Sequence, residues 1–103
     1  KSDIIVHQGY KFSPKEIEKV LNQTENVIES CVILISDQED MIIAFCISNS
    51  NELDHKYLKK FCRENLEYYK VPKKFILCDQ IEKTNSGKLK RKHMREKYFG
   101  KDI

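Results

Sequence analysis

A single lysine closes a turn-forming run near the C-terminal end, in the segment Lys83-Thr84-Asn85-Ser86-Gly87-Lys88. Asn, Ser and Gly favour turns, and the hydroxyls of Thr84 and Ser86 can fix such a turn through side-chain hydrogen bonds. The run therefore predicts that Lys88 stands at the mouth of a basic helix over about residues 87–97, where its compact ammonium could bind an anion. The basic residues of this predicted helix are also typical of a solvated helix face or a nucleic-acid-binding patch.

A second glycine, Gly9, lies between two short β-prone runs at residues 4–6 and 10–12. This spacing predicts a small hairpin in which glycine supplies a backbone conformation that other residues avoid. A glycine there also lets a ligand approach the main chain. The sequence alone leaves open whether Gly9 serves only the turn or a ligand as well.

Composition narrows the classes of protein. The chain has 103 residues, of which 40% are hydrophobic, and this suits one domain with a modest core. Its 19 basic and 16 acidic residues give a net charge of only +3, which argues against a dedicated nucleic-acid binder and leaves a local anion site plausible. No apolar run approaches the roughly 20 residues of a membrane span, so we expect no membrane-spanning helix.

The cysteines are spread at wide intervals inside apolar stretches, without a Cys-x-x-Cys pair. Free Cys behaves as a small hydrophobe, so we expect buried free thiols in a reducing cytoplasm, and neither disulfides nor a metal site. The residues concerned are Cys31, Cys46, Cys62 and Cys78.

Periodicity predicts the remaining elements. Ser13-Pro14-Lys15-Glu16 is a capping box that begins a helix over about residues 14–22. Apolar β-branched runs at 27–35 and 41–47 predict two antiparallel strands, both central in a sheet. Asp54 caps a second helix, and a short strand follows at 75–78.

The element order is thus hairpin, helix, strand, strand, helix, strand, turn, helix. It predicts an α+β fold, in which a small β-hairpin is followed by a compact sheet of about three strands with helices packed against it.

Three stretches carry a further pattern: residues 3–18 (DIIVHQGYKFSPKEIE), 69–75 (YKVPKKF) and 83–89 (KTNSGKL). In order and spacing they resemble motifs of the C-terminal domain of the AMP-forming adenylating enzymes, the superfamily of acyl-CoA synthetases, nonribosomal-peptide adenylation domains and luciferases. The resemblance covers essentially the whole chain. It implies that residues 1–103 are a mobile lid domain of a longer protein, whose nucleotide-binding N-terminal domain is absent from this sequence.

The resemblance also implies the chemistry. The N-terminal domain would bind ATP with Mg²⁺ and a carboxylic acid, and would form an acyl-adenylate and pyrophosphate. The thiol of CoA, or of a carrier-protein phosphopantetheine, would then displace AMP. The small domain would rotate between two orientations to serve the two half-reactions, and it would be inactive alone.

Site residues follow by resemblance. Lys88 is the catalytic adenylation lysine, and Gly87 lets the backbone approach the nucleotide. Gly9 matches the glycine that lines the pantetheine tunnel, where a side chain would obstruct the thiol arm. Lys11 stands where many members carry arginine, and Arg63 matches a position that contacts CoA phosphates in some acetyl-CoA synthetases. For both cations, an exposed surface charge stays open as an alternative.

The hinge is assigned to Ser2 and Asp3. Serine departs from the usual Asp or Lys at that place, Glu82 replaces a customary proline, and Val6 and Gln8 replace commonly basic residues. These departures indicate a divergent member.

Two other hypotheses remain. The basic C-terminal helix and the pair Tyr68-Tyr69 could bind RNA or single-stranded DNA. Alternatively, the domain could be a non-catalytic interaction domain of an enzyme that has lost its adenylating activity, although the retained Lys88 argues against that reading.

Overall fold

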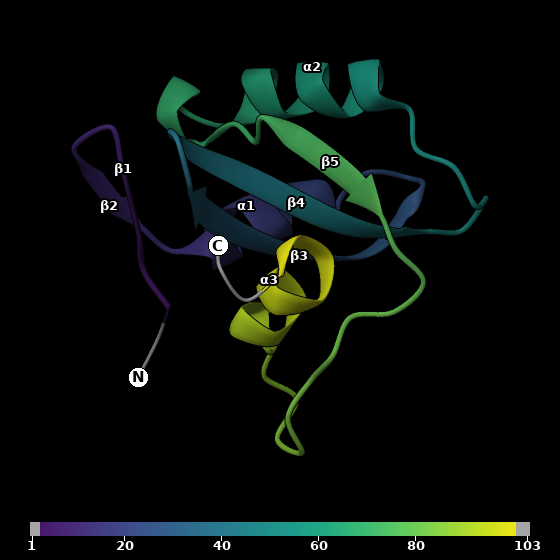
Figure 1. Ribbon diagram of the computed structural model, residues 1–103. Coiled ribbons are helices and arrows are strands. Elements are labelled where there is room, and N and C mark those ends of the chain that lie inside the picture. The colour runs from purple at the N-terminus through teal and green to yellow at the C-terminus, as the bar shows by residue number, and fades with distance from the viewer. Residues whose placement is uncertain (1–2, 101–103) are drawn as a thin grey trace.

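The computed structural model describes residues 3–100, and within them it shows the predicted α+β fold (Figure 1). Its elements follow the predicted order, with a short 3₁₀ turn (η1) that the sequence did not indicate. The elements are β1 (Ile5–His7), β2 (Tyr10–Phe12), α1 (Pro14–Leu21), β3 (Val27–Ser36), β4 (Asp40–Ser48), α2 (His55–Asn65), η1 (Tyr68–Lys70), β5 (Lys74–Leu77) and α3 (Arg91–Phe99).

The main sheet has the strand order β3-β4-β5, with β3 antiparallel and β5 parallel to β4. The prediction that both long strands are central is therefore wrong for β3, which lies at an edge. The chain crosses through α2 before β5, and this crossover brings β5 to the other side of β4 as a parallel neighbour.

Charged side chains cover part of the free edge of β3. The backbone N–H of Val32 donates to Glu18 Oε2 at 2.8 Å, and the carbonyl of Val32 accepts from Arg91 Nε at 3.1 Å. The carbonyl of Leu34 accepts from Arg95 Nη2 at 3.2 Å. Unpaired backbone groups at an edge invite association with another strand, so these bonds protect β3 as well as fixing α1 and α3 beside it.

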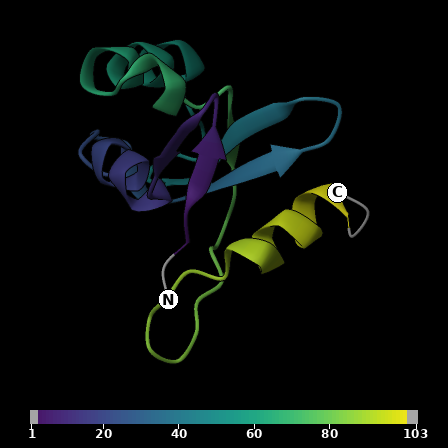
Figure 2. The ribbon, with the colours of Figure 1, turned by 90° about the vertical axis from the view of Figure 1, so that its left-hand side faces the viewer.

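The sheet lies between two helical layers. In Figure 2, α1 and α2 lie on one face and α3 on the other. Because successive side chains of a strand point to opposite faces, the long apolar runs of β3 and β4 supply both layers. Ile17, Leu21, Leu58 and Cys62 cover the first face, and Met94 is the fully buried contact of α3 on the second.

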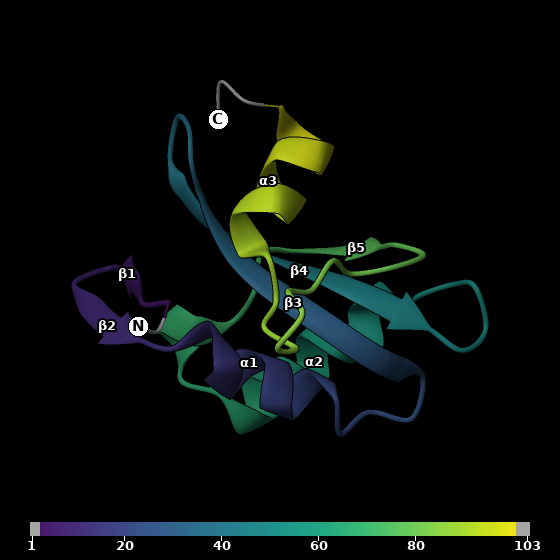
Figure 3. The ribbon, with the colours of Figure 1, turned by 90° about the horizontal axis from the view of Figure 1, so that it is seen from below.

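The start of α1 confirms the capping box. Ser13 Oγ accepts from the backbone N–H of Lys15 at 3.1 Å, and the Glu16 carboxylate accepts from the N–H of Ser13 at 3.3 Å. The start of α3 differs from the prediction, because this helix begins at Arg91 and not near residue 87. The preceding segment forms its own turn, which extends below the sheet in Figure 1 and is seen in front of the sheet, at the start of α3, in the view from below of Figure 3.

Within the described residues, no helix is long and apolar enough to cross a membrane.

All four cysteines are buried and free of disulfides, as predicted. Burial raises the pKa of Cys31 and of Cys46 to about 12, and that of Cys62 to about 11. Thiol reagents attack the thiolate, so each of these thiols is both shielded and protonated near neutral pH.

We expect a thiol reagent at pH 8 to label the native domain at none of these three cysteines, and to label them only at urea concentrations that unfold it. Mass spectrometry of labelled peptides checks this. Rapid labelling of Cys46 in the native protein would contradict the burial described above.

Candidate functional site

The Lys88 turn, residues 83–89, is a small hairpin closed by a bridge between Lys83 and Leu89. The N–H of Thr84 donates to the carbonyl of Lys88 at 2.8 Å, and the N–H of Lys88 returns to Thr84 Oγ1 at 3.1 Å. The hydroxyls of Thr84 and Ser86 lie 3.0 Å apart, and Gly87 has φ +90°. Side-chain hydrogen bonds and a glycine thus fix the shape of the turn, as the sequence predicts.

Lys88 is exposed on this turn, and it stands three residues before α3 instead of at the mouth of that helix. It borders a small pocket of about 230 Å³. The pocket is also lined by Asp3, Lys15, Glu18, Ser86, Gly87, Leu89 and Arg91. Lys88, Gly87 and the hinge candidate Asp3 therefore lie around one pocket.

Arg91 lines that pocket and makes several charge-assisted bonds. Its Nη2 lies 2.8 and 2.7 Å from the two carboxylate oxygens of Glu18, and its Nη1 lies 2.6 Å from Asp3 Oδ2. The side chains of Arg91 and Glu18 are 10% and 9% exposed. Burial disfavours the Arg91 cation, but the Glu18 carboxylate outweighs that cost and raises the pKa of Arg91.

The Gly9 turn connects β1 and β2. Gln8 has φ +52° and Gly9 has φ +84°, the two positive values typical of a tight hairpin turn. Gly9 is exposed, and a Cβ added to it would meet no heavy atom within 4 Å beyond its chain neighbours among the described residues. The turn therefore needs glycine for its backbone conformation, and the space above it is open.

Two contacts fix the hairpin that carries Gly9. Tyr10 stacks on Tyr69, with ring centroids 3.6 Å apart and an interplanar angle of 6°. Lys70 Nζ lies 2.6 Å from Glu16 Oε1, and the Lys70 side chain is largely buried. The hydrogen bond with Glu16 outweighs desolvation and raises the pKa of Lys70. η1 thereby attaches the hairpin to α1.

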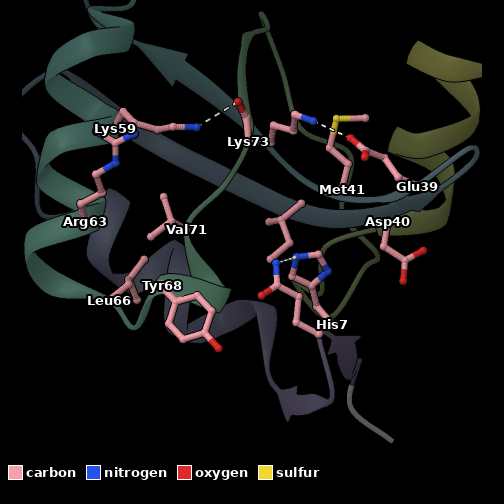
Figure 4. A pocket seen from close by; sticks show the side chains of 12 residues that line it. His7, Glu39, Asp40, Met41, Lys59, Arg63, Leu66, Tyr68, Val71 and Lys73 are labelled. Atoms are coloured by element: carbon pink, nitrogen blue, oxygen red, sulfur yellow. Dashed lines mark hydrogen bonds and ion pairs between the residues drawn. The ribbon is translucent and has the colours of Figure 1, made fainter.

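A larger pocket of about 470 Å³ opens beside the hairpin (Figure 4). Figure 4 shows Lys59 and Arg63 extending from α2, with His7 of the hairpin across from them. Lys59 Nζ donates to the carbonyl of Pro72 at 2.9 Å, and burial lowers the pKa of Lys59. The lining also includes Gln8, Glu39, Asp40, Met41, Ile42, Leu66, Tyr68, Val71 and Lys73.

The predicted site residues thus form two groups. Arg63 shares the larger pocket with Gln8 of the Gly9 turn, whereas Lys88 and Gly87 share the smaller one with Asp3. The two pockets have no lining residue in common. Lys11 is exposed on β2 and lines neither pocket, and Ser2 lies outside the described residues.

Sequence reasoning missed Lys59 and the Glu18–Arg91 pair. One signal could have found Glu18, because it shares the inward face of α1 with Pro14, Ile17 and Leu21 at helical spacing. A carboxylate on an apolar face needs a partner. Among residues 3–100, no group of three His, Cys, Asp or Glu side chains could hold a metal ion.

Known proteins share this sequence and fold. A 2-succinylbenzoate–CoA ligase from Listeria innocua is 34% identical over 100 residues, which are 95% of this chain and 21% of the relative. A mitochondrial acyl-coenzyme A synthetase from Mus musculus is 33% identical over 106 residues, covering 95% of this chain and 18% of that protein.

Solved structures agree. The o-succinylbenzoate CoA synthetase of Bacillus subtilis has a TM-score of 0.84 at 30% identity over 93% of this chain and 20% of its own. A fatty acyl CoA synthetase from Mycobacterium tuberculosis has a TM-score of 0.83 at 31% identity over the same shares. The chain therefore spans about a fifth of the length of these relatives.

The model of the AMP-binding enzyme C-terminal domain matches residues 16–88. This match covers more than half of the chain and includes both Arg63 and Lys88, whereas the Gly9 hairpin lies before it. The predicted membership is confirmed: the chain belongs to the family of AMP-binding enzyme C-terminal domains.

Proposed function

We propose that this chain is the mobile C-terminal domain of an ATP-dependent, AMP-forming acid:thiol ligase. The enzyme activates a carboxylic acid as its adenylate and then transfers the acyl group to the thiol of CoA or of a carrier-protein phosphopantetheine. ATP, with Mg²⁺, and the acid would be bound mainly by an N-terminal domain of the complete enzyme. The free buried thiols suit a reducing compartment such as the cytoplasm.

The observation that carries this proposal is the Lys88 turn. An exposed lysine is presented on a turn that its own hydrogen bonds and a glycine hold in shape. The chain around it is about a third identical to CoA ligases along nearly its whole length. The solved structures of an o-succinylbenzoate CoA synthetase and a fatty acyl CoA synthetase, which share this fold, support the same function.

The chemistry of adenylation explains the need for this lysine. A carboxylate oxygen attacks the α-phosphorus of ATP, a new carbon–oxygen–phosphorus anhydride forms, and pyrophosphate leaves with its electron pair. Both reactants are anionic, so negative charge accumulates where they meet. A preorganised ammonium stabilises that charge most where water is excluded, as at an interface between two closed domains. Lys88 fills this role.

The second half-reaction uses the larger pocket, beside the Gly9 turn. A thiol attacks the acyl carbon, and AMP leaves as the anhydride bond breaks. The Gly9 turn offers an open path for the thiol arm, and Arg63 offers a cation for a phosphate group in the adjoining pocket. The two pockets share no lining residue, which suits a domain that presents one of them in each half-reaction by rotation about a hinge at Ser2 and Asp3.

The helix α3 favours the ligase over the nucleic-acid alternative. Two of its cations, Arg91 and Arg95, donate to carbonyl groups of β3, so they are committed to the fold. A nucleic-acid-binding helix would need such cations free for phosphates.

The products of ATP cleavage test this function. The complete enzyme is given ATP, CoA and a panel of acids that begins with 2-succinylbenzoate and long-chain fatty acids, the acids named in its relatives. We expect one AMP and one pyrophosphate for each thioester formed, and no ATP cleavage by the isolated domain. Formation of ADP and phosphate with the thioester would contradict the proposal.

A further inference from the structure

The Lys88 turn has two anchors in the fold. On its N-terminal side, Lys83 forms an ion pair with Glu29 of β3 and a β-bridge with Leu89. On its C-terminal side, Arg91 binds Glu18, the Val32 carbonyl and Asp3 at once. The turn itself lies on the surface between these anchors.

The second anchor, Arg91, is largely buried and contacts residues far from it along the chain. Arg91 is held by both oxygens of Glu18, and Glu18 is in turn held by the N–H of Val32 at 2.8 Å. Removal of a buried pair's partner leaves an uncompensated charge, so this arrangement is costly to disturb. It connects α1, β3 and the first turn of α3 in one network.

The network is also close to Lys88 along the chain. Three residues can extend over at most about 10 Å, so the position of Arg91 limits where the Lys88 backbone can lie. Both members of the pair line the pocket that Lys88 borders. The long side chain of Lys88 lets its ammonium extend away from the turn. The position of the Lys88 backbone, however, depends on the Glu18–Arg91 pair, which we call the clamp.

We propose that Glu18 and Arg91 are positioning residues for Lys88, acting on the adenylation half-reaction through the placement of its turn. This inference rests on the proposed function of Lys88. Asp3 extends the clamp to the segment that leads to the hinge, since its carboxylate binds the same guanidinium.

The variant Arg91→Met in the complete enzyme tests the clamp. A misplacement of about 1 Å can cost on the order of 100-fold in rate, and partial retention of the turn by the Lys83 anchor leads us to expect roughly a 10- to 30-fold fall in kcat for adenylation. The KM for ATP should change less than roughly threefold, and so should the rate of thioester formation from a supplied acyl-adenylate. Arg91→Lys and Glu18→Gln, which are milder, should show smaller losses of the same selectivity.

Arg95→Met is the matched control. It removes another arginine of α3 that donates to a β3 carbonyl, but it lies one helical turn farther from Lys88. We expect a smaller loss of thermal stability, because Arg95 makes one such bond where Arg91 makes several, and no selective loss of adenylation. Equal losses in both half-reactions for Arg91→Met, or the same selective loss in Arg95→Met, would show a merely structural role and overturn the proposal.

A double variant separates this inference from the proposed function. If Arg91 acts through Lys88, then Arg91→Met should cause no further fall in adenylation once Lys88→Ala is present. Additive losses would overturn the positioning role. If Lys88→Ala itself leaves adenylation intact, the function of Lys88 fails first. Should Arg91→Met fail to fold, Arg91→Lys and Glu18→Gln carry the same tests.

Discussion

Replacement of Lys88 by alanine should lower the rate of adenylate formation by about 10²- to 10³-fold, the cost of removing one preorganised charge-stabilising group from a transition state. The fold should be unaffected, because the side chain is exposed and the turn is closed by the backbone of Lys88 and by Thr84. Thioester formation from a supplied acyl-adenylate should remain within about threefold of the unmodified rate, since the proposed charge develops only in the first step.

Pyrophosphate exchange into ATP measures the first step, and thioester release from synthetic acyl-adenylate measures the second. Lys92→Ala is the matched control, because Lys92 is another exposed lysine of the same basic run and should leave both rates unchanged. Equal losses of both half-reactions in Lys88→Ala would contradict the assigned role. A retained adenylation rate would remove Lys88 from the mechanism altogether.

Local sequence signals predicted most of the elements. Ser13 and Glu16 form their capping box across three residues, and the apolar β-branched runs at 27–35 and 41–47 indicate an adjacent pair of strands. The edge position of β3 could not be predicted in this way, because it depends on the side of β4 with which the distant strand β5 pairs. Strand order is a property of the whole chain.

The site was predicted only in part for the same reason. Thr84, Ser86 and Gly87 are close in sequence, so their turn followed from local chemistry. The predicted start of α3 was wrong because the Lys83–Leu89 bridge holds the intervening residues in a hairpin until Arg91. The Glu18–Arg91 pair joins residues 73 positions apart, and no local pattern indicates such a contact.

Replacement of Gly9 by leucine should have the opposite selectivity to Lys88→Ala. We expect thioester formation to fall by about 100-fold, because a side chain on the open side of the turn would displace the incoming thiol by an ångström or more. Adenylation should stay within about threefold, since the Gly9 turn and the Lys88 turn border different pockets. The two half-reaction assays used for Lys88→Ala measure this.

Backbone strain is the competing explanation, and Gly100 separates it from obstruction. Gly9 and Gly100 have φ of +84° and +86°, and a Cβ at either would meet no heavy atom within 4 Å beyond its chain neighbours in the described part of the chain. Gly100 has ψ 169°, a conformation open almost only to glycine, so leucine should cost at least as much there as the roughly 1–2 kcal/mol of a left-handed residue. If Gly100→Leu lowers stability without slowing thioester formation, strain cannot account for the Gly9 variant, and the space above the β1–β2 turn is left as the path of the thiol.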